Sequence, residues 1–213
     1  MNAAVPSKIA VMFPQKSFLR LSALLAFVSS NAPVLAEDSK LTLFEVPALS
    51  SIPRLPDALP SDARLTKELR LVAAQGEFEP ASFVIAPHVD VSRLTISASS
   101  LTGPDGASIP AGNLDLKVVK CWYQGGTAWY SYFGDSNRRE LVPELLLNDE
   151  KLVRVDREQQ ENYLRVGGDY QSISYPREKA TKAFNYLTEP VSDAQTLQPI
   201  ELRDGEHKQI WIT

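Results

Sequence analysis

The chain has 213 residues, of which 44% are hydrophobic and 23% charged, and its formal net charge is −4. This composition excludes disordered, collagen-like and multispanning membrane proteins, and the length suits one domain of ordinary size or two small ones. The sequence contains one cysteine, which excludes an internal disulfide framework. A hydrophobic core must therefore stabilise the fold.

The first 36 residues have the pattern of a secretory signal peptide. They contain no Asp or Glu, three basic residues precede the apolar run 21–28, and Val34-Leu35-Ala36 supplies a cleavage site. The apolar run is much shorter than the about 18 residues of a membrane-spanning helix, so a stable membrane anchor is the weaker alternative. Met12 is an alternative start to Met1, because it gives a positive region of more usual length.

Removal of the signal peptide during export changes the charge of the chain that carries out the function. Removal of residues 1–36 leaves residues 37–213 with 19 basic and 26 acidic side chains, a net charge of −7. We expect this mature domain in the periplasm or outside the cell, and we expect no binding to nucleic acid through a basic face. Cys121 stands near Val119 and Trp122, a setting that favours a buried, inert thiol over a reactive one.

Short strands are expected along the first half of the mature chain. Residues 41–46 predict a strand, and four prolines between positions 47 and 60 make the next segment an extended surface connector. Period-two alternation predicts half-buried strands at 68–73, 82–85 and 94–98. Pro104 and Gly106 indicate a hairpin turn within 101–110.

The second half continues in the same way. In the strand predicted for 114–123, the apolar parity switches at Val119, which indicates a bulge or a strand end buried on both faces. Further strands are predicted at 144–147, 152–155, 163–166 and 170–175. Residues 176–196 are predicted to form a loop with at most a helical turn.

The last fifteen residues hold two turn and strand signals. Asp204-Gly205 lies between two alternating runs and predicts a hairpin. Residues 210–213 form an apolar strand that would leave an exposed edge, from which we infer an N-terminal piece of a longer protein or a shortened relative of one. The pattern as a whole predicts an all-β fold, an antiparallel β-sandwich of immunoglobulin-like or galactose-binding-like type.

The sequence contains few of the motifs that are typical of catalytic sites. His88 and His207 fall in predicted turns without partner ligands, so we expect no metal site, and the absence of nucleotide-binding loops leads us to expect no cofactor. Two carboxylate pairs remain, Glu77 with Glu79 and Asp149 with Glu150. Each could serve as a general acid and base; alternatively, the first pair opens a strand and the second forms a solvated turn.

An aromatic segment is the clearest candidate for binding. Residues 121–133 contain six of the eighteen aromatic residues of the chain. Aromatic faces stack on sugar C–H surfaces, and Trp and Tyr also offer hydrogen bonds. Packing against a partner domain is the alternative that we favour, because the segment directly follows a buried strand. The candidate ligand-binding residues are Trp122, Tyr123, Trp129, Tyr130 and Tyr132.

Four sequence segments resemble those of a known family and occur in the same order along the chain. They are VAAQGEFEPASFV from Val72, KVVKCWYQ from Lys117, LVPELLLND from Leu141, and the stretch from LQPI to KQIW between Leu197 and Trp211. Together they are similar to the N-terminal β-sandwich region of exported bacterial glycoside hydrolases of the family 123 type, the β-N-acetylgalactosaminidase-like family. The resemblance runs over most of residues 41–213.

The resemblance implies a role for the chain. In that family a catalytic barrel follows the sandwich and carries an acidic pair that acts with the acetamido group of the substrate, and none of its catalytic residues matches a position here. The resemblance thus implies a noncatalytic accessory module whose partner is the catalytic domain of the parent protein, or a glycan. A stand-alone carbohydrate-binding protein and a small hydrolase that uses Glu77 and Glu79 remain as alternatives.

Overall fold

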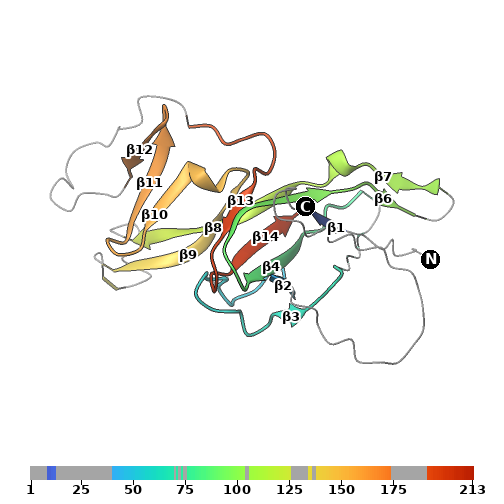
Figure 1. Ribbon diagram of the computed structural model, residues 1–213, viewed down its shortest axis with the longest axis horizontal. Coiled ribbons are helices and arrows are strands. Elements are labelled where there is room, and N and C mark those ends of the chain that lie inside the picture. Colours follow the sequence, from blue (N-terminus) through green and yellow to red (C-terminus); the bar gives the residue numbers. More distant parts are fainter. Residues whose placement is uncertain are drawn as a thin grey trace.

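Figure 1 shows the computed structural model, in which the regular secondary structure of the described residues consists of antiparallel β-strands and two single-turn 3₁₀ helices. The structure describes residues 9–12, 40–69, 71, 73, 76–103, 106–125, 134–135, 138–173 and 191–213. The predicted all-β class is confirmed for this part of the chain. Among the same residues, no helix has the length and apolar character needed to cross a membrane.

The strands are β1 (Ile9–Met12), β2 (Leu41–Val46), β3 (Arg64–Leu65), β4 (Ala81–Pro87), β5 (Val91–Ala98), β6 (Leu101–Thr102), β7 (Ser108–Ile109), β8 (Leu116–Gly125), β9 (Arg139–Leu147), β10 (Val153–Asp156), β11 (Glu161–Val166), β12 (Asp169–Ser172), β13 (Ile200–Leu202) and β14 (Lys208–Ile212). The 3₁₀ helices are η2 (Ala111–Asn113) and η4 (Glu150–Leu152). The largest sheet has six strands in the order β3-β2-β4-β14-β8-β9. Two three-stranded sheets, β1-β5-β13 and β10-β11-β12, and the β6-β7 hairpin complete the described strands.

Strand β14 lies inside the six-stranded sheet. It pairs antiparallel with β4 on one side and with β8 on the other, and Ile210 and Ile212 are buried. The prediction that this apolar strand forms an exposed edge is therefore wrong. Its apolar character arises from packing within the core, because an interior strand has neighbours on both sides.

The core lies where the six-stranded sheet meets β5 and β13. Phe83, Ile85 and Ile210 of the large sheet pack in one cluster with Leu94 and Ile200. The alternation predicted for 94–98 is confirmed in β5, where Leu94 and Ile96 are buried. Strand β4 differs from the half-buried strand predicted for 82–85, because all seven of its residues are buried.

Ser82 shows how a polar residue is accommodated in β4. Its side chain is 1% exposed, its hydroxyl donates to the Ile210 carbonyl oxygen at 3.0 Å, and the same hydroxyl accepts a hydrogen bond from the Gln209 amide at 2.7 Å. A buried hydroxyl with both partners costs little. The sequence showed a polar position, and two long-range hydrogen bonds make it compatible with burial.

The alternating segment 68–73 is not a strand at its described positions. The chain leaves the β2–β3 pair at Thr66, whose hydroxyl accepts a hydrogen bond from the Glu68 backbone amide at 3.1 Å. Such a local side-chain contact competes with a ladder hydrogen bond. Leu69 and Leu71 still pack on the core, so their spacing reflects burial rather than strand pairing.

The Asp204-Gly205 turn does not join a hairpin. Strand β13 pairs with β5, whereas β14 pairs with β4 and β8, so the turn carries the chain from one sheet to another. Gly205 has the positive φ of 73° that the turn signal requires. The local prediction of a turn is confirmed, and the predicted pairing of its flanks is wrong.

One further local prediction is confirmed, and another holds in part. Strands β6 and β7 pair as a hairpin, with Gly106 at a φ of 78°. The parity switch in β8 marks a register shift between Lys120 and Cys121, but the extra residue is Glu144 of β9, between Pro143 and Leu145, and β8 itself has no bulge there. Proline is tolerated at this position because β9 is the edge of the sheet.

Strand β1 falls within the predicted signal peptide. It pairs with β5 over four residues, and it takes no part in the six-stranded sheet. The rest of the predicted signal peptide and residues 176–190 of the predicted loop lie outside the described residues.

Candidate functional site

The five candidate aromatic residues do not form one described surface. Trp122 and Tyr123 are neighbours on β8 and therefore point to opposite faces of the sheet. Trp129, Tyr130 and Tyr132 lie outside the described residues. The two described rings thus belong to two different environments.

Trp122 takes part in a polar patch on one face of the sheet. Its indole Nε1 donates to the Glu144 Oε2 atom at 2.7 Å, and the side-chain amide of Gln124 donates to the same oxygen. Trp122 and Gln124 share a face because they are two residues apart on β8, and Glu144 lies on the neighbouring strand β9. We refer to Trp122, Gln124 and Glu144 as the Trp122 patch.

Tyr123 joins two sheets. Its backbone amide donates to Asn162 Oδ1 at 2.9 Å, and Asn162 Nδ2 donates to the Tyr123 carbonyl oxygen at 2.7 Å. Asn162 is 6% exposed and belongs to β11. The phenol hydroxyl of Tyr123 donates to the Arg157 carbonyl oxygen at 3.5 Å. Tyr123 therefore serves the junction between β8 and the β10-β11-β12 sheet.

The first carboxylate pair, Glu77 and Glu79, lies on an exposed segment that precedes β4. No strand holds the two side chains on one face there, since β4 begins at Ala81. The strand on which the sequence interpretation as an acid and base pair depends therefore does not include these positions.

Asp149 and Glu150 are oriented toward different partners. Asp149 accepts from the Lys151 backbone amide at 2.9 Å and forms an ion pair with Arg165 at 2.7 Å. Burial would raise the pKa of Asp149, but the hydrogen bonds from Arg165 and the Lys151 amide outweigh it and lower the pKa below its ordinary value. The prediction of a solvated turn is wrong, because the side chains of Asp149 and Glu150 contact other segments of the chain.

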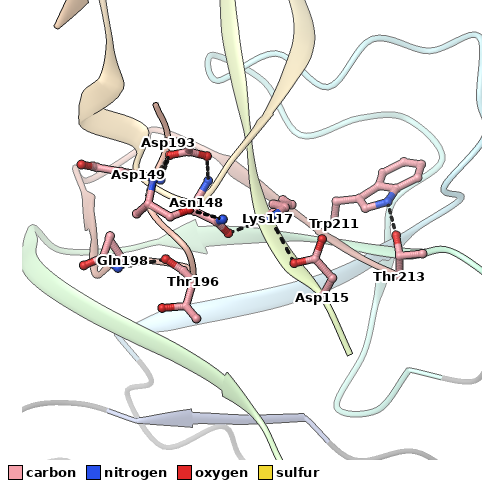
Figure 2. Close-up of polar contacts among 10 residues, drawn as sticks. Asp115, Lys117, Asn148, Asp149, Asp193, Thr196, Gln198, Trp211 and Thr213 are labelled. Atoms are coloured by element: carbon pink, nitrogen blue, oxygen red, sulfur yellow. Dashed lines mark hydrogen bonds and ion pairs between the residues drawn. The ribbon is translucent and has the colours of Figure 1, made fainter. Parts of the chain in front are cut away.

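Figure 2 shows the polar network that holds this turn. The Asp193 carboxylate accepts from the backbone amides of Asn148, at 2.6 Å, and Asp149, at 2.9 Å. Lys117 of β8 donates to Asn148 Oδ1 at 2.9 Å and forms an ion pair with Asp115 at 3.1 Å. The network fixes the segment after residue 190 against β8 and β9, and its groups are all used in structural contacts.

Glu150 lies on the other side of the turn and is 7% exposed. Its Oε1 atom accepts from the Glu201 backbone amide at 2.8 Å, and its Oε2 atom forms a short ion pair with the Lys208 ammonium group. Lys208 also donates to the Glu201 carbonyl oxygen at 2.6 Å. Glu150 thus ties η4 to the ends of β13 and β14.

A cavity of about 310 Å³ opens beside this ion pair. It is lined by the Pro-rich connector, residues 119–121 of β8, η4, β10 and the segment between β13 and β14. Its lining includes seven Lys or Arg residues and three Glu residues, in a chain whose net charge is negative. We refer to it as the cationic cavity. The cationic residues are Arg54, Lys120, Lys151, Arg154, Arg157, Arg203 and Lys208.

Burial dominates the chemistry of Lys120 and Cys121, which lie at the register shift between β8 and β9 and line the cavity. Desolvation lowers the pKa of Lys120, although Glu150 and Glu206 oppose this effect. Desolvation also raises the pKa of Cys121 to about 12, and its thiol contacts the Arg54 carbonyl oxygen at 3.5 Å. The thiol is therefore held protonated, which agrees with the predicted inert cysteine.

The two histidines lie apart from any cluster of ligands. His88 is hydrogen-bonded to the Thr42 hydroxyl at 2.7 Å, and the His207 ring faces the Pro56 carbonyl oxygen at 3.3 Å. In the described part of the chain, no group of three His, Cys, Asp or Glu side chains is placed to hold a metal ion.

Sequence reasoning missed the cationic cavity. Its basic residues are spread from position 54 to position 208, and each stands in a segment whose local pattern indicates only a strand or a turn. The one local signal was the parity switch in β8, which indicated an irregularity near Lys120, where the register with β9 shifts. Comparison of the chain with protein-family models, curated proteins and solved structures gave no match.

Proposed function

We propose that this chain is a noncatalytic accessory module of an exported glycoside hydrolase and supports a catalytic barrel. In this proposal residues 1–36 direct export to the periplasm or the extracellular space and are then removed. Residues 37–213 form an antiparallel β-sandwich of immunoglobulin-like or galactose-binding-like type. The partner is the catalytic domain of the parent protein.

The structural contacts of the Asp149 and Glu150 carboxylates are the observation that carries this proposal. A general acid and base must face a common substrate. Asp149 instead holds Arg165, and Glu150 holds Lys208 and the Glu201 amide. Carboxylates committed to such contacts support the framework of a module, and the resemblance to the sandwich region of the family 123 type supports the same role.

The gene beyond codon 213 tests the proposal most directly. We expect a sequence that encodes a barrel-type domain, either in frame or after a frameshift. A stop codon followed by no barrel-like sequence would contradict the accessory role. As a second arm, the purified chain should release no nitrophenol from a nitrophenyl N-acetyl-β-galactosaminide. Turnover that disappears in a Glu77→Gln, Glu79→Gln double variant would favour the small hydrolase instead.

The Trp122 patch favours a second candidate, a stand-alone carbohydrate-binding protein. The patch combines an indole with a carboxylate and an amide on one face of the sheet. Such a set provides both a stacking surface and hydrogen-bonding groups for a sugar. The candidate residues Tyr123, Trp129, Tyr130 and Tyr132 from the sequence remain part of this proposal.

Titration of the protein against a glycan panel tests this candidate. Binding at millimolar ligand is expected, together with its loss in Trp122→Ala. Trp211→Phe is the control, because Trp211 lies on β14 and its Nε1 atom donates to the Thr213 hydroxyl at 2.9 Å. No binding at millimolar ligand, or equal binding by Trp122→Ala and the control, would count against the candidate.

A further inference from the structure

The cationic cavity holds more positive charge than its own carboxylates neutralise. Four of its seven basic residues have carboxylate partners, in the pairs Arg54–Asp62, Lys151–Glu201, Arg157–Asp57 and Lys208–Glu150. Lys120, Arg154 and Arg203 form no ion pair with a described residue. Of the three Glu residues in the lining, Glu206 likewise forms no ion pair with a described residue. Two positive charges therefore remain in excess, in a molecule that is acidic as a whole.

Lys120 is the least hydrated of the three unpaired cations. It is half-buried, whereas Arg154 and Arg203 are exposed. Burial lowers the pKa of Lys120, which means that its charged form is incompletely solvated in the folded protein. The Lys120 ammonium group has no ion pair or hydrogen bond with a described residue, and Glu150 and Glu206 oppose the effect of burial only in part, so an anion within the cavity would add a partner for this charge.

Arg154 is held in place at the same cavity. Its guanidinium carbon lies 4.5 Å from the centre of the Tyr163 ring and 4.7 Å from the centre of the Tyr170 ring. Tyr170 also lines the cavity, and its hydroxyl donates to the Lys151 carbonyl oxygen at 2.6 Å. Stacking on aromatic rings leaves guanidinium N–H groups available to bind an oxyanion.

We propose that the cationic cavity is a binding site for one oxyanion group of a small ligand, a sulfate, phosphate or carboxylate. Lys120 contacts the anion from β8, and Arg154 and Arg203 contribute further donors. The cavity volume of about 310 Å³ suits a ligand of sugar size. This site goes beyond the proposed accessory role, because it requires neither a catalytic domain nor the Trp122 patch.

Anion titration of the purified protein tests the site. Sodium sulfate, sodium phosphate and sodium glucuronate are compared with sodium chloride at equal ionic strength, by calorimetry and by thermal shift. At least one probe should bind saturably and raise the melting temperature beyond the chloride control. Equal affinity for the inorganic anions and glucuronate would assign recognition to the anion alone, and tighter binding of glucuronate would add contacts with the sugar ring.

Two variants on strand β8 form a matched pair. Lys120→Met removes the charge in the cavity and should weaken binding about tenfold or more, the loss expected for a charged hydrogen bond. Lys117→Met removes a charge that is paired with Asp115 outside the cavity, and it should leave the affinity unchanged within about twofold. Without ligand, Lys120→Met should be at least as stable as the unmodified protein, because it removes a poorly hydrated charge.

The variant Arg203→Gln is a second test of anion binding, at an exposed position of the cavity. It should weaken binding by about threefold or more, and it keeps the proposal testable if Lys120→Met fails to fold. The proposal is overturned if none of the three probes binds saturably up to about 10 mM beyond the chloride effect. It is also overturned if Lys120→Met and Lys117→Met weaken binding equally, or if Lys120→Met does not fold and Arg203→Gln binds like the unmodified protein.

Discussion

The ion pair between Glu150 and Lys208 should contribute strongly to stability. The Glu150 side chain is 8% exposed and that of Lys208 is 14% exposed. Replacement of Glu150 by Gln removes the negative charge and retains a carbonyl oxygen that can accept from the Glu201 amide. The Lys208 ammonium group is then left in a buried setting with one carbonyl partner, the Glu201 oxygen.

The expected loss follows from this geometry. Removal of one partner of a buried ion pair costs about 3–5 kcal/mol, and the retained hydrogen bond of Gln places Glu150→Gln near about 3 kcal/mol. With a urea dependence of about 2 kcal/mol per molar, the unfolding midpoint should fall by roughly 1.5 M. A Glu150→Gln, Lys208→Met double variant should lose less than the sum of the two single variants, because no charge is left unpaired.

Urea unfolding followed by tryptophan fluorescence measures both quantities. Lys151→Met is the matched control, because Lys151 forms an ion pair with Glu201 next to the same site, with side chains that are 54% and 53% exposed. This exposed pair should contribute at most about 1 kcal/mol. A loss below about 1 kcal/mol for Glu150→Gln, or equal losses in the two variants, would refute the reasoning from burial.

Three further predictions concern pH, the thiol and the core. Burial raises the pKa of Asp149, but the Arg165 hydrogen bond outweighs this effect, so the pKa is lowered in the folded protein. The ionised Asp149 should therefore stabilise the protein at neutral pH, and this stabilisation should be lost as the pH falls through the acidic range. Urea midpoints measured from pH 6 to 3 should show a smaller loss of stability in Arg165→Met than in the unmodified protein. Iodoacetamide should alkylate Cys121 at pH 8 at least about a hundredfold more slowly in the folded than in the urea-unfolded protein, as followed by mass spectrometry, and similar rates would contradict the raised pKa. Ile210→Ala should cost about 3–4 kcal/mol in the same unfolding assay, because the residue is fully buried, whereas Leu146→Ala, at a position that is 46% exposed, should cost much less.

Local patterns predicted those elements that depend on near neighbours in sequence. The strand at 41–46, the turn around Gly106 and the position of the irregularity between β8 and β9 were all indicated by short stretches of residues. A parity switch can be recognised in one strand because side chains alternate strictly between two faces. The position of the shift therefore followed from β8 alone, whereas its extra residue, Glu144, lies in the partner strand.

Pairing partners and the candidate site could not be predicted in the same way. Asp204-Gly205 specifies a turn, but nothing local distinguishes a hairpin from a passage between two sheets. The cationic cavity likewise depends on segments that only the fold brings together. Of the aromatic prediction, Trp122 and Tyr123 are described, and their opposite orientations follow from adjacency on one strand.

The interior position of β14 has a consequence for how the protein folds. Strand β14 alone joins the β3-β2-β4 half of the large sheet to the β8-β9 half, and the Ser82 hydroxyl that bonds to Ile210 is separated from it by 128 residues of sequence. Contacts over such a separation close large loops and slow folding. During synthesis, the two halves of the sheet cannot pair through β14 until residues 208–212 have left the ribosome. We therefore expect a late, cooperative folding step, during which the inner edges of β4 and β8 are open to chaperones.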